Sequence, residues 1–299
     1  MIKIVGTGLS GLVGSRIVEL LQKKYQFVDF SLDSGVDITK LPSLKKAFTQ
    51  NLGCEAVIHL AAFTNVSEAA KQEGNKNGLC YKINVIGTQN IVNLCQEYDK
   101  YLIHFSTDFV FDGKKKTAYT EEDKPHPIEW YSRTKYLAEK IVCQSKNPWL
   151  IARIAFPFKA KPSPKKFEPK IKLDLVRTII QKLKIGQEVK MFTDQIITPT
   201  FIDDIAKAID IFIQKKPTGV YHLVGSNFIT PYNLALKICK VFNFDKTKVK
   251  KTSLHEYQTI DPRPRQFSLC LSNKKLEKTL KVKMFSLDQA FQKIKIQLR

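Results

Sequence analysis

The sequence predicts an α/β fold built on a doubly wound parallel sheet, and three observations lead to this prediction. Short apolar runs alternate with longer amphipathic stretches from the N-terminus to about residue 154. The first apolar run leads directly into a glycine-rich turn. Several runs end in small or polar residues, and sheets of this kind bind their ligands at the carboxyl ends of the strands.

The first apolar run, residues 2–5, is predicted to be a buried strand that enters the glycine-rich turn 6–14. The backbone amides of such a turn, together with the N-terminus of the following helix, form a site for a pyrophosphate. Glycines allow the tight turn and let phosphates approach the backbone. Residues 12–22 continue as that helix, because their apolar residues recur on one side. This unit predicts a Rossmann-like dinucleotide site.

The second predicted strand, residues 26–32, leaves the choice of cofactor open. An acid at the end of this strand would bind the ribose hydroxyls of NAD, whereas a small residue leaves room for the 2′-phosphate of NADP. Asp29 lies inside the run, Ser31 lies near its tip and Asp33 follows it. We therefore expect the protein to use both NADPH and NADH, with a modest preference for NADPH.

Two further strands are expected to bring small and polar residues to the same edge of the sheet. Residues 56–62 end in two alanines, whose small side chains let a cofactor lie against the backbone. Residues 101–106 lead directly to Thr107 and Asp108. The helices around these strands are expected from residue 41 and over residues 81–97.

Tyr131 and Lys135 are four residues apart in a predicted helix that runs to about residue 145, so both side chains project from one face. An ammonium group beside a phenol lowers the pKa of that phenol. A phenol tuned in this way can exchange a proton with a substrate oxygen near neutral pH. The Thr107 hydroxyl can hold the same oxygen. We interpret the pair as catalytic because the other features converge on the same edge of the sheet.

After residue 154 the pattern changes. Residues 156–169 are rich in lysine and proline and are predicted to form an exposed loop. The elements expected beyond this loop are a helix over residues 170–184, a helix that ends near residue 214, a strand over 220–223, a helix over 231–242, a loop at 263–265 and two short closing helices.

The composition is that of a soluble globular protein with a basic surface. The chain has 299 residues and a net charge of +21, from 49 Lys+Arg against 28 Asp+Glu. The lysines are spread along the chain without an aromatic-basic stripe, which favours a solvated surface over a nucleic-acid site, with steering of an anionic substrate as the functional alternative. The six cysteines show no paired or metal-type spacing, which predicts free thiols in a reducing cytoplasm and no metal site.

These motifs resemble those of the extended short-chain dehydrogenase/reductases. The stretches that carry the resemblance are residues 7–14, 59–62, 84–88, 106–108 and 131–135. Within that family the chain is most similar to the dTDP-4-dehydrorhamnose reductases. This closer similarity extends over nearly the whole chain, through residues 106–112, 121–135, 194–200, 219–224 and 263–264.

The resemblance implies a role for each matching residue. Tyr131 is the implied acid/base, Lys135 holds the nicotinamide ribose and lowers the pKa of Tyr131, and Thr107 orients the sugar carbonyl. The implied cofactor-binding residues are Gly8, Leu9, Ser10, Gly11, Gly14, Ser31, Asp37, Ile38, Leu60, Ala61, Ala62, Asn84, Tyr131 and Lys135. The implied residues of the sugar-nucleotide pocket are Thr64, Asn65, Thr107, Asp108, Phe156 and Arg263.

The resemblance also implies two domains. Residues 1–154 and 197–224 would form the dinucleotide-binding domain, and residues 155–196 and 225–299 a smaller, discontinuous C-terminal substrate domain. The chain departs from the family at Ser132, where glycine is usual. The segment 159–170 is also longer and more basic, and residues 64–68 match only in part. These departures leave the exact sugar open.

We therefore expect a cytoplasmic reductase of a nucleotide-linked 4-keto sugar that uses NADPH or NADH. We expect neither a nucleic acid nor a membrane as its partner, and it could form a homodimer. An epimerase or dehydratase of the same superfamily is one alternative, because these enzymes return the hydride within a turnover. A regulatory subunit that binds the cofactor without catalysis is another alternative.

Overall fold

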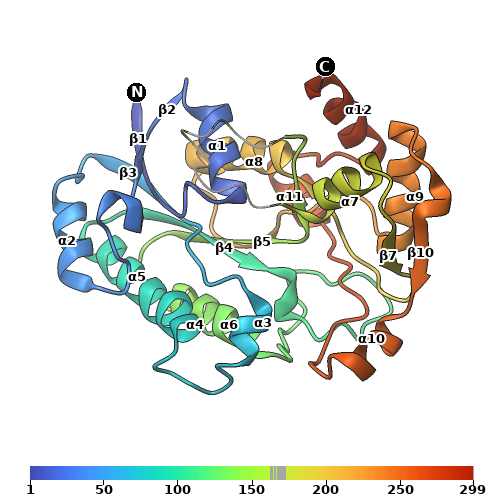
Figure 1. Ribbon diagram of the computed structural model, residues 1–299. Helices are drawn as coiled ribbons and strands as arrows, with labels where there is room; N and C mark the ends of the chain where they lie inside the picture. The colour runs from blue at the N-terminus through green and yellow to red at the C-terminus, as the bar shows by residue number, and fades with distance from the viewer. Residues whose placement is uncertain (162–163, 165, 167–172, 299) are drawn as a thin grey trace.

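A six-stranded parallel sheet forms the centre of the computed structural model, which describes residues 1–161, 164, 166 and 173–298 (Figure 1). Its strands are β1 (Ile2–Thr7), β2 (Tyr25–Asp29), β3 (Cys54–His59), β4 (Tyr101–Thr107), β5 (Trp149–Ile154) and β9 (Gly219–His222). Their order is β2-β1-β3-β4-β5-β9, and every neighbouring pair is parallel. The chain reverses its direction of travel across the sheet beside β1, where a doubly wound sheet leaves a crevice for ligands. The predicted fold class is confirmed.

Helices cover both faces of this sheet (Figure 1). On one face lie α1 (Leu12–Leu21), α8 (Ile202–Lys215) and α11 (Lys274–Leu280). On the other face lie α2 (Leu41–Thr49), α5 (Thr88–Glu97) and α6 (Trp130–Cys143). Successive strand residues face opposite sides, so Ile4 joins the first core and Val5 the second. Burial on both faces explains why the strands read as continuous apolar runs.

A third apolar core lies beside the sheet. It is built on α7 (Leu175–Lys184), α9 (Pro231–Phe242) and α12 (Leu287–Gln297), with the parallel ladder of β7 (Val189–Phe192) and β10 (Val249–Thr252). A two-residue ladder joins β6 (Pro157–Phe158) to β8 (Thr200–Phe201). Neither ladder was predicted, because strands of two to four residues are too short to show a periodic pattern.

The remaining elements are short. They are the helices α3 (Val66–Ala70), α4 (Leu79–Tyr81) and α10 (Leu254–Ile260), and the 3₁₀ turns η1 (Leu32–Ser34), η3 (Asp108–Val110) and η4 (Lys246–Lys248). The π-helical segment η2 (Lys82–Gly87) joins α4 to α5 within the single helix predicted over residues 81–97. Among the described residues, no helix is long and apolar enough to cross a membrane.

Three predicted boundaries differ clearly from the structure. The strand predicted over residues 56–62 is β3, which ends at His59, so the two alanines lie in the loop after it. The strand predicted over residues 26–32 ends at Asp29, because the chain turns into η1 at Leu32. The helix predicted from residue 170 has its described part from Leu175, capped by the Asp174 carboxylate, which accepts from the Arg177 amide. The exposed loop predicted over residues 156–169 is wrong in its described part, because residues 157–158 form β6 and residues 158–160 are buried against the neighbouring core. Residues 170–172 of the helix prediction, and most of the loop prediction beyond residue 161, lie outside the described residues.

Candidate active site

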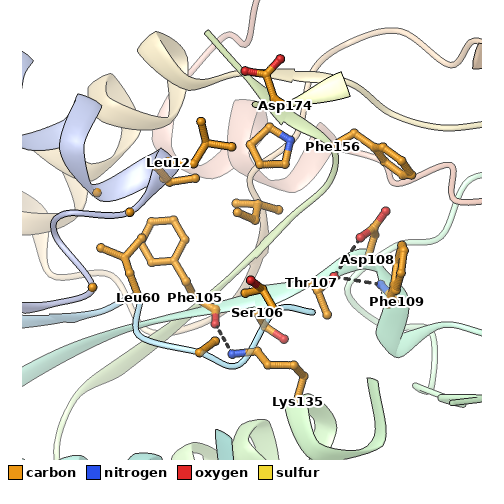
Figure 2. A pocket seen from close by; sticks show the side chains of 18 of the residues that line it. Leu12, Leu60, Phe105, Ser106, Thr107, Asp108, Phe109, Lys135, Phe156 and Asp174 are labelled. Atoms are coloured by element: carbon orange, nitrogen blue, oxygen red, sulfur yellow. Dashed lines mark hydrogen bonds between the residues drawn. The ribbon is translucent and has the colours of Figure 1, made fainter. Parts of the chain in front are cut away.

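A cavity of about 560 Å³ lies at the carboxyl ends of β1, β3 and β4 (Figure 2). Its wall includes Gly8, Gly11, Gly14, Leu60, Ala62, Thr64, Thr107, Asp108, Tyr131, Lys135 and Phe156, all of which the sequence placed at a cofactor or substrate site. The glycine-rich turn and the helix that carries Tyr131 therefore face one space, although more than a hundred residues separate them along the chain.

The glycine-rich turn fits the pyrophosphate of a dinucleotide. Gly8 has a φ of +68°, and a Cβ on it would lie 2.8 Å from the Ala61 nitrogen. A Cβ on Gly14 would lie 2.5 Å from the Gly8 oxygen, so both positions need glycine for the turn itself. A Cβ on Gly11, the N-cap of α1, would meet only the Gly8 oxygen, at 3.2 Å. Gly11 therefore keeps space open where the helix N-terminus can receive phosphate.

Asp29 is a candidate cofactor residue that was not selected from the sequence. It is the last residue of β2, and its Oδ2 accepts a hydrogen bond of 2.7 Å from the Ser31 hydroxyl. Burial raises the pKa of Asp29, while Ser31 and the Leu9 amide of the glycine-rich turn lower it. An acid here, beside that turn, can bind ribose hydroxyls. It was missed because the apolar run continues past it to Leu32.

The helix α6 begins with a capping box that also explains Ser132. The Glu129 carboxylate accepts hydrogen bonds from the amides of Tyr131 and Ser132, at 3.1 and 2.9 Å. The Ser132 hydroxyl donates to the Glu129 carbonyl at 2.9 Å and accepts from the Glu129 amide. This reciprocal cap fixes the first turn of the helix, which carries Tyr131. Serine in place of the family's usual glycine thus has a structural role here.

Lys135 lies on the inner side of α6, against the sheet. Only 3% of it is exposed, and its Nζ donates to the Phe105 carbonyl at 2.7 Å (Figure 2). Burial lowers the pKa of Lys135 to about 8, although the nearby Glu139 carboxylate raises it. One turn further on, Glu139 forms a buried ion pair of 2.7 Å with Arg153 of β5. This pair attaches α6 to the sheet.

The expected lowering of the Tyr131 pKa was wrong for this structure. Burial raises the pKa of Tyr131, the charges of Asp108 and Glu129 raise it further, and the Thr107 hydroxyl lowers it in part. Lys135 is not among the causes of this shift, and its ammonium group donates to the main chain of β4. The phenol therefore keeps its proton at neutral pH, which suits a proton donor.

Thr107 and Asp108 form a short hydrogen-bonded unit at the end of β4 (Figure 2). The Thr107 hydroxyl donates to Asp108 Oδ1 at 2.9 Å and accepts from the Phe109 amide at 3.2 Å. Asp108 is 3% exposed, and its Oδ2 has no hydrogen-bond partner among the described residues. Burial raises the pKa of Asp108 to about 7, against the lowering by the Thr107 hydroxyl and two backbone amides.

Other predicted residues lie outside the wall of this cavity. They are Leu9, Ser10, Ser31, Asp37, Ile38, Ala61, Asn65, Asn84 and Arg263. Asn84 is 1% exposed and acts as a brace, since its Oδ1 accepts from the Phe63 amide and its Nδ2 donates to Thr134. It therefore holds the chain that follows β3 against α6. Asn65 caps α3 by accepting from the Glu68 amide.

Arg263 lines a smaller pocket of about 90 Å³. This pocket shares Val66 and Phe109 with the main cavity, so the two adjoin at these residues. Arg263 donates to Asp261 at 2.8 Å, and Arg265 donates to the same carboxylate at 2.6 Å. Two guanidinium groups beside one carboxylate can bind phosphate oxygens of a substrate that extends from the cavity. Phe109 was missed because one aromatic residue in a loop carries no pattern.

The side chains that could bind a metal ion are dispersed in the described part of the chain. Within residues 1–161, 164, 166 and 173–298, no group of three or more histidine, cysteine or acidic side chains could hold an ion. All six cysteines are free thiols, and Cys143 is the exposed one. The polar side chains that line the cavity carry hydroxyl, carboxyl and ammonium groups.

Known proteins resemble this chain in sequence and in fold. A sequence profile of the RmlD substrate binding domain matches residues 2–298. The chain is 28% identical, over 280 residues that cover 89% of each protein, to a probable low-salt glycan biosynthesis reductase of Haloferax volcanii. It is 25% identical, over 315 residues and 99% of each protein, to the dTDP-4-dehydrorhamnose reductase of Aggregatibacter actinomycetemcomitans.

The fold is also similar to a solved structure, the crystal structure of the dTDP-4-dehydrorhamnose reductase from Bacillus anthracis in complex with NADP. The superposition covers 100% of both chains, with a TM-score of 0.87 and 26% sequence identity. Because the profile extends over nearly every residue, the chain belongs to the RmlD substrate binding domain family.

Proposed function

We propose that this chain reduces a dTDP-linked 4-keto sugar with NADPH or NADH. The observation that carries the proposal is that Thr107, Tyr131 and Lys135 line the same cavity as Gly8 and Gly11. A dinucleotide bound at the turn would extend into the space that the three polar side chains face. Reductases of dTDP-sugars among the relatives, one of them solved with NADP, support this function.

Each polar side chain has a distinct part in the proposed reaction. When bound, the reduced nicotinamide supplies the hydride to the keto carbon. Tyr131 donates its proton to the sugar oxygen as negative charge develops there. The Thr107 hydroxyl donates a hydrogen bond to the same oxygen. Lys135, with a pKa of about 8, carries a positive charge at neutral pH and contributes a favourable field at this end of the cavity.

The proposed substrate site extends from the main cavity into the smaller pocket. Arg263 and Arg265 hold the diphosphate, and Thr64 and Phe156 line the space for the sugar. Phe156 has a φ of +41°, a strained conformation for a residue with a side chain, and such strain persists where the surroundings hold it for function. In this proposal residues 155–196 and 225–299 form the substrate domain.

The test is a substrate screen with purified protein. Nucleotide-linked 4-keto sugars, each with dTDP or UDP, are mixed with NADPH or NADH, and the loss of reduced-nicotinamide absorbance is followed. The expected result is stoichiometric oxidation of the cofactor with formation of a hydroxyl at C4 of the dTDP-sugar. An epimerase or dehydratase would convert its substrate without net consumption of cofactor. Absence of consumption with every sugar, at a cofactor concentration that saturates binding, rules the proposal out.

We further propose that the protein works in a reducing cytoplasm, as a homodimer and without nucleic acid. The free thiols support the compartment. Sedimentation at micromolar concentration tests the dimer. A DNA-binding titration at two salt concentrations tests the last point, because phosphate contacts give an affinity that falls steeply with salt.

A further inference from the structure

The Thr107 hydroxyl has one proton, and besides the Tyr131 phenol, which keeps its own proton, two groups can accept it. One is Asp108 Oδ1 at 2.9 Å, and the other, under the proposed function, is the carbonyl oxygen of the substrate. The Phe109 amide already donates to Thr107 Oγ1 at 3.2 Å. A hydroxyl oxygen can accept twice but donate once, so Thr107 cannot donate to both groups. Whatever controls the Asp108 hydrogen bond therefore controls the hydrogen bond to the substrate.

Asp108 is placed where a charge is poorly accommodated. It is 3% exposed and lines the cavity, and its buried Oδ2 has no hydrogen-bond partner among the described residues. An ionised carboxylate with a bare buried oxygen carries a large desolvation penalty, whereas a neutral carboxyl avoids most of it. Burial accordingly raises the pKa of this group to about 7.

None of the other titratable groups that line the cavity forms a hydrogen bond or an ion pair with Asp108 among the described residues. Tyr131 and Lys135 come from α6, and Asp174 comes from the segment before α7. Tyr131 is neutral, since burial raises its pKa. Lys135 donates to the main chain of β4, and Asp174 is paired with Arg177 at 2.6 Å. None of the three is among the causes that shift the pKa of Asp108.

We propose that Asp108 is a positioning residue that keeps its own proton and thereby directs the Thr107 hydroxyl toward the substrate carbonyl. In the neutral state Asp108 Oδ1 donates to Thr107 Oγ1, which leaves the threonine proton for the substrate oxygen. In the ionised state Oδ1 takes that proton in a charge-assisted hydrogen bond, and the substrate loses a donor. Both states have the same heavy-atom positions, because only protons differ.

The rates of reduction and of the reverse oxidation then depend on pH through Asp108. A neutral Asp108 favours reduction, since Thr107 then donates to the developing alkoxide. An ionised Asp108 leaves Thr107 able to accept from a substrate hydroxyl, which suits the reverse oxidation. Raising the pH through about 7 should therefore lower kcat/KM for reduction. The proposed function is needed here only to identify the oxygen that Thr107 meets.

The proton on Asp108 can be measured without substrate. The protein is labelled with ¹³C at the aspartate Cγ, and the carboxyl signals are titrated by NMR in the parent and in Asp108→Asn. We expect one carboxyl that titrates near pH 7 in the parent and is absent from the variant. If the signal removed by the substitution titrates in the ordinary aspartate range near about 4, the inference is overturned. This readout stands even if the parent reduces no 4-keto sugar, so the two failures are distinguishable.

The effect on Thr107 is tested by pH profiles of dTDP-4-keto sugar reduction. Asp108→Asn cannot ionise, yet its amide can donate to Thr107 as the neutral carboxyl does. We expect the parent kcat/KM to fall by up to about tenfold per pH unit above pH 7, as for loss of one essential proton. The variant should lose the fall near pH 7 and show only the later fall near pH 8 from Lys135.

A double-mutant comparison separates positioning from a general structural role. In a Thr107→Val background, Asp108→Asn should leave the pH profile unchanged, because the group it acts through has gone. Calorimetry with NADPH should give the same cofactor affinity for all four proteins. The inference is overturned if Asp108→Asn retains the fall near pH 7, if it lowers kcat as strongly at low as at high pH, or if it shifts the profile equally with and without Thr107.

Discussion

Tyr131 is the residue on which the proposed chemistry depends most directly. Burial and neighbouring charge keep its proton in place at neutral pH, and its ring packs edge-on against Phe109 at 6.2 Å. Tyr131→Phe removes the hydroxyl and leaves that packing, so folding and cofactor affinity should be unchanged. We expect kcat to fall by about 10²–10⁴, the usual contribution of general-acid catalysis. Turnover equal to the parent would show that another group is the acid.

Lys135 and Thr107 should act with Tyr131 as one unit. Lys135→Met should lower kcat more than Tyr131→Phe does, because it removes a buried charge and the contact with the Phe105 carbonyl. Thr107→Val should raise the barrier by roughly 2.7–4 kcal/mol, the loss from one oxyanion donor. The combined variants should lose less than the sum of the single losses, because the groups serve one oxygen.

The matched control for these kinetic measurements is Lys140→Met. Lys140 is exposed in the last turn of the same helix, so its loss should leave kcat unchanged. Additive losses in the combined variants would contradict a shared oxygen. A loss in Lys140→Met as large as that in Lys135→Met would show that the helix, rather than the buried ammonium, is being perturbed.

Asp29 should set the choice of cofactor. Its carboxylate lies at the end of β2, where it can bind ribose hydroxyls and repel a 2′-phosphate, which shifts the expected preference toward NADH. We expect both cofactors to bind, within about a hundredfold of each other, or roughly 2.7 kcal/mol. Asp29→Ser should strengthen NADPH binding and weaken NADH binding in calorimetry.

The exposed Asp33→Ser is the control for this cofactor prediction, because Asp33 carries the same charge in the neighbouring 3₁₀ turn η1. It should change the affinity ratio of NADH to NADPH much less than Asp29→Ser does. An unchanged ratio in Asp29→Ser would mean that the carboxylate does not face the ribose. If the parent protein binds NADPH more than about a hundredfold more tightly than NADH, Asp29 is not a ligand of the ribose hydroxyls.

At the scale of elements, the unit of β1, its turn and α1 should bind the dinucleotide through Gly11. Gly11→Val places a branched side chain in front of the helix N-terminus, where its Cβ meets only the Gly8 oxygen at 3.2 Å. We expect NADPH and NADH binding to be abolished in calorimetry while the thermal unfolding transition is retained. Undiminished affinity in the folded variant would remove the pyrophosphate assignment.

Two further glycines provide the comparison for Gly11→Val. Gly53→Ala meets no atom within 4 Å and should change neither binding nor stability by much. Gly14→Ala brings its Cβ to 2.5 Å from the Gly8 oxygen and should destabilise the fold itself. The contrast separates a residue that keeps space for the ligand from one that the turn requires.

At the scale of the whole molecule, the net charge of +21 should attract the anionic nucleotide sugar. We expect KM for the dTDP-sugar to rise as salt increases from about 0.01 to 0.5 M, while kcat changes little, because salt shortens the Debye length from roughly 30 Å to a few ångströms. A neutral salt series with steady-state kinetics measures this. A KM that is independent of salt would mean that the basic surface is only solvated.

Local sequence patterns were sufficient to predict the alternation of strands and helices, the glycine-rich turn and the Tyr131–Lys135 pair. These are local patterns: each strand is an apolar run, and each helix repeats its apolar residues at a fixed spacing. The doubly wound sheet follows from that alternation. The predicted site residues were largely those at strand ends, and parallel strands bring their carboxyl ends to one edge whatever the details of packing.

The protonation of these groups and their hydrogen-bond partners depend instead on tertiary packing. Burial, which depends on residues distant in sequence, raises the pKa of Tyr131 where local spacing predicted a lowering. The Phe105 carbonyl accepts a hydrogen bond from the Lys135 ammonium group. The ladders β6–β8 and β7–β10 pair segments that are too short to show a periodic pattern. Local sequence encodes which groups are present, while desolvation and hydrogen-bond partners are set by the packed interior, and these determine whether a proton stays or leaves.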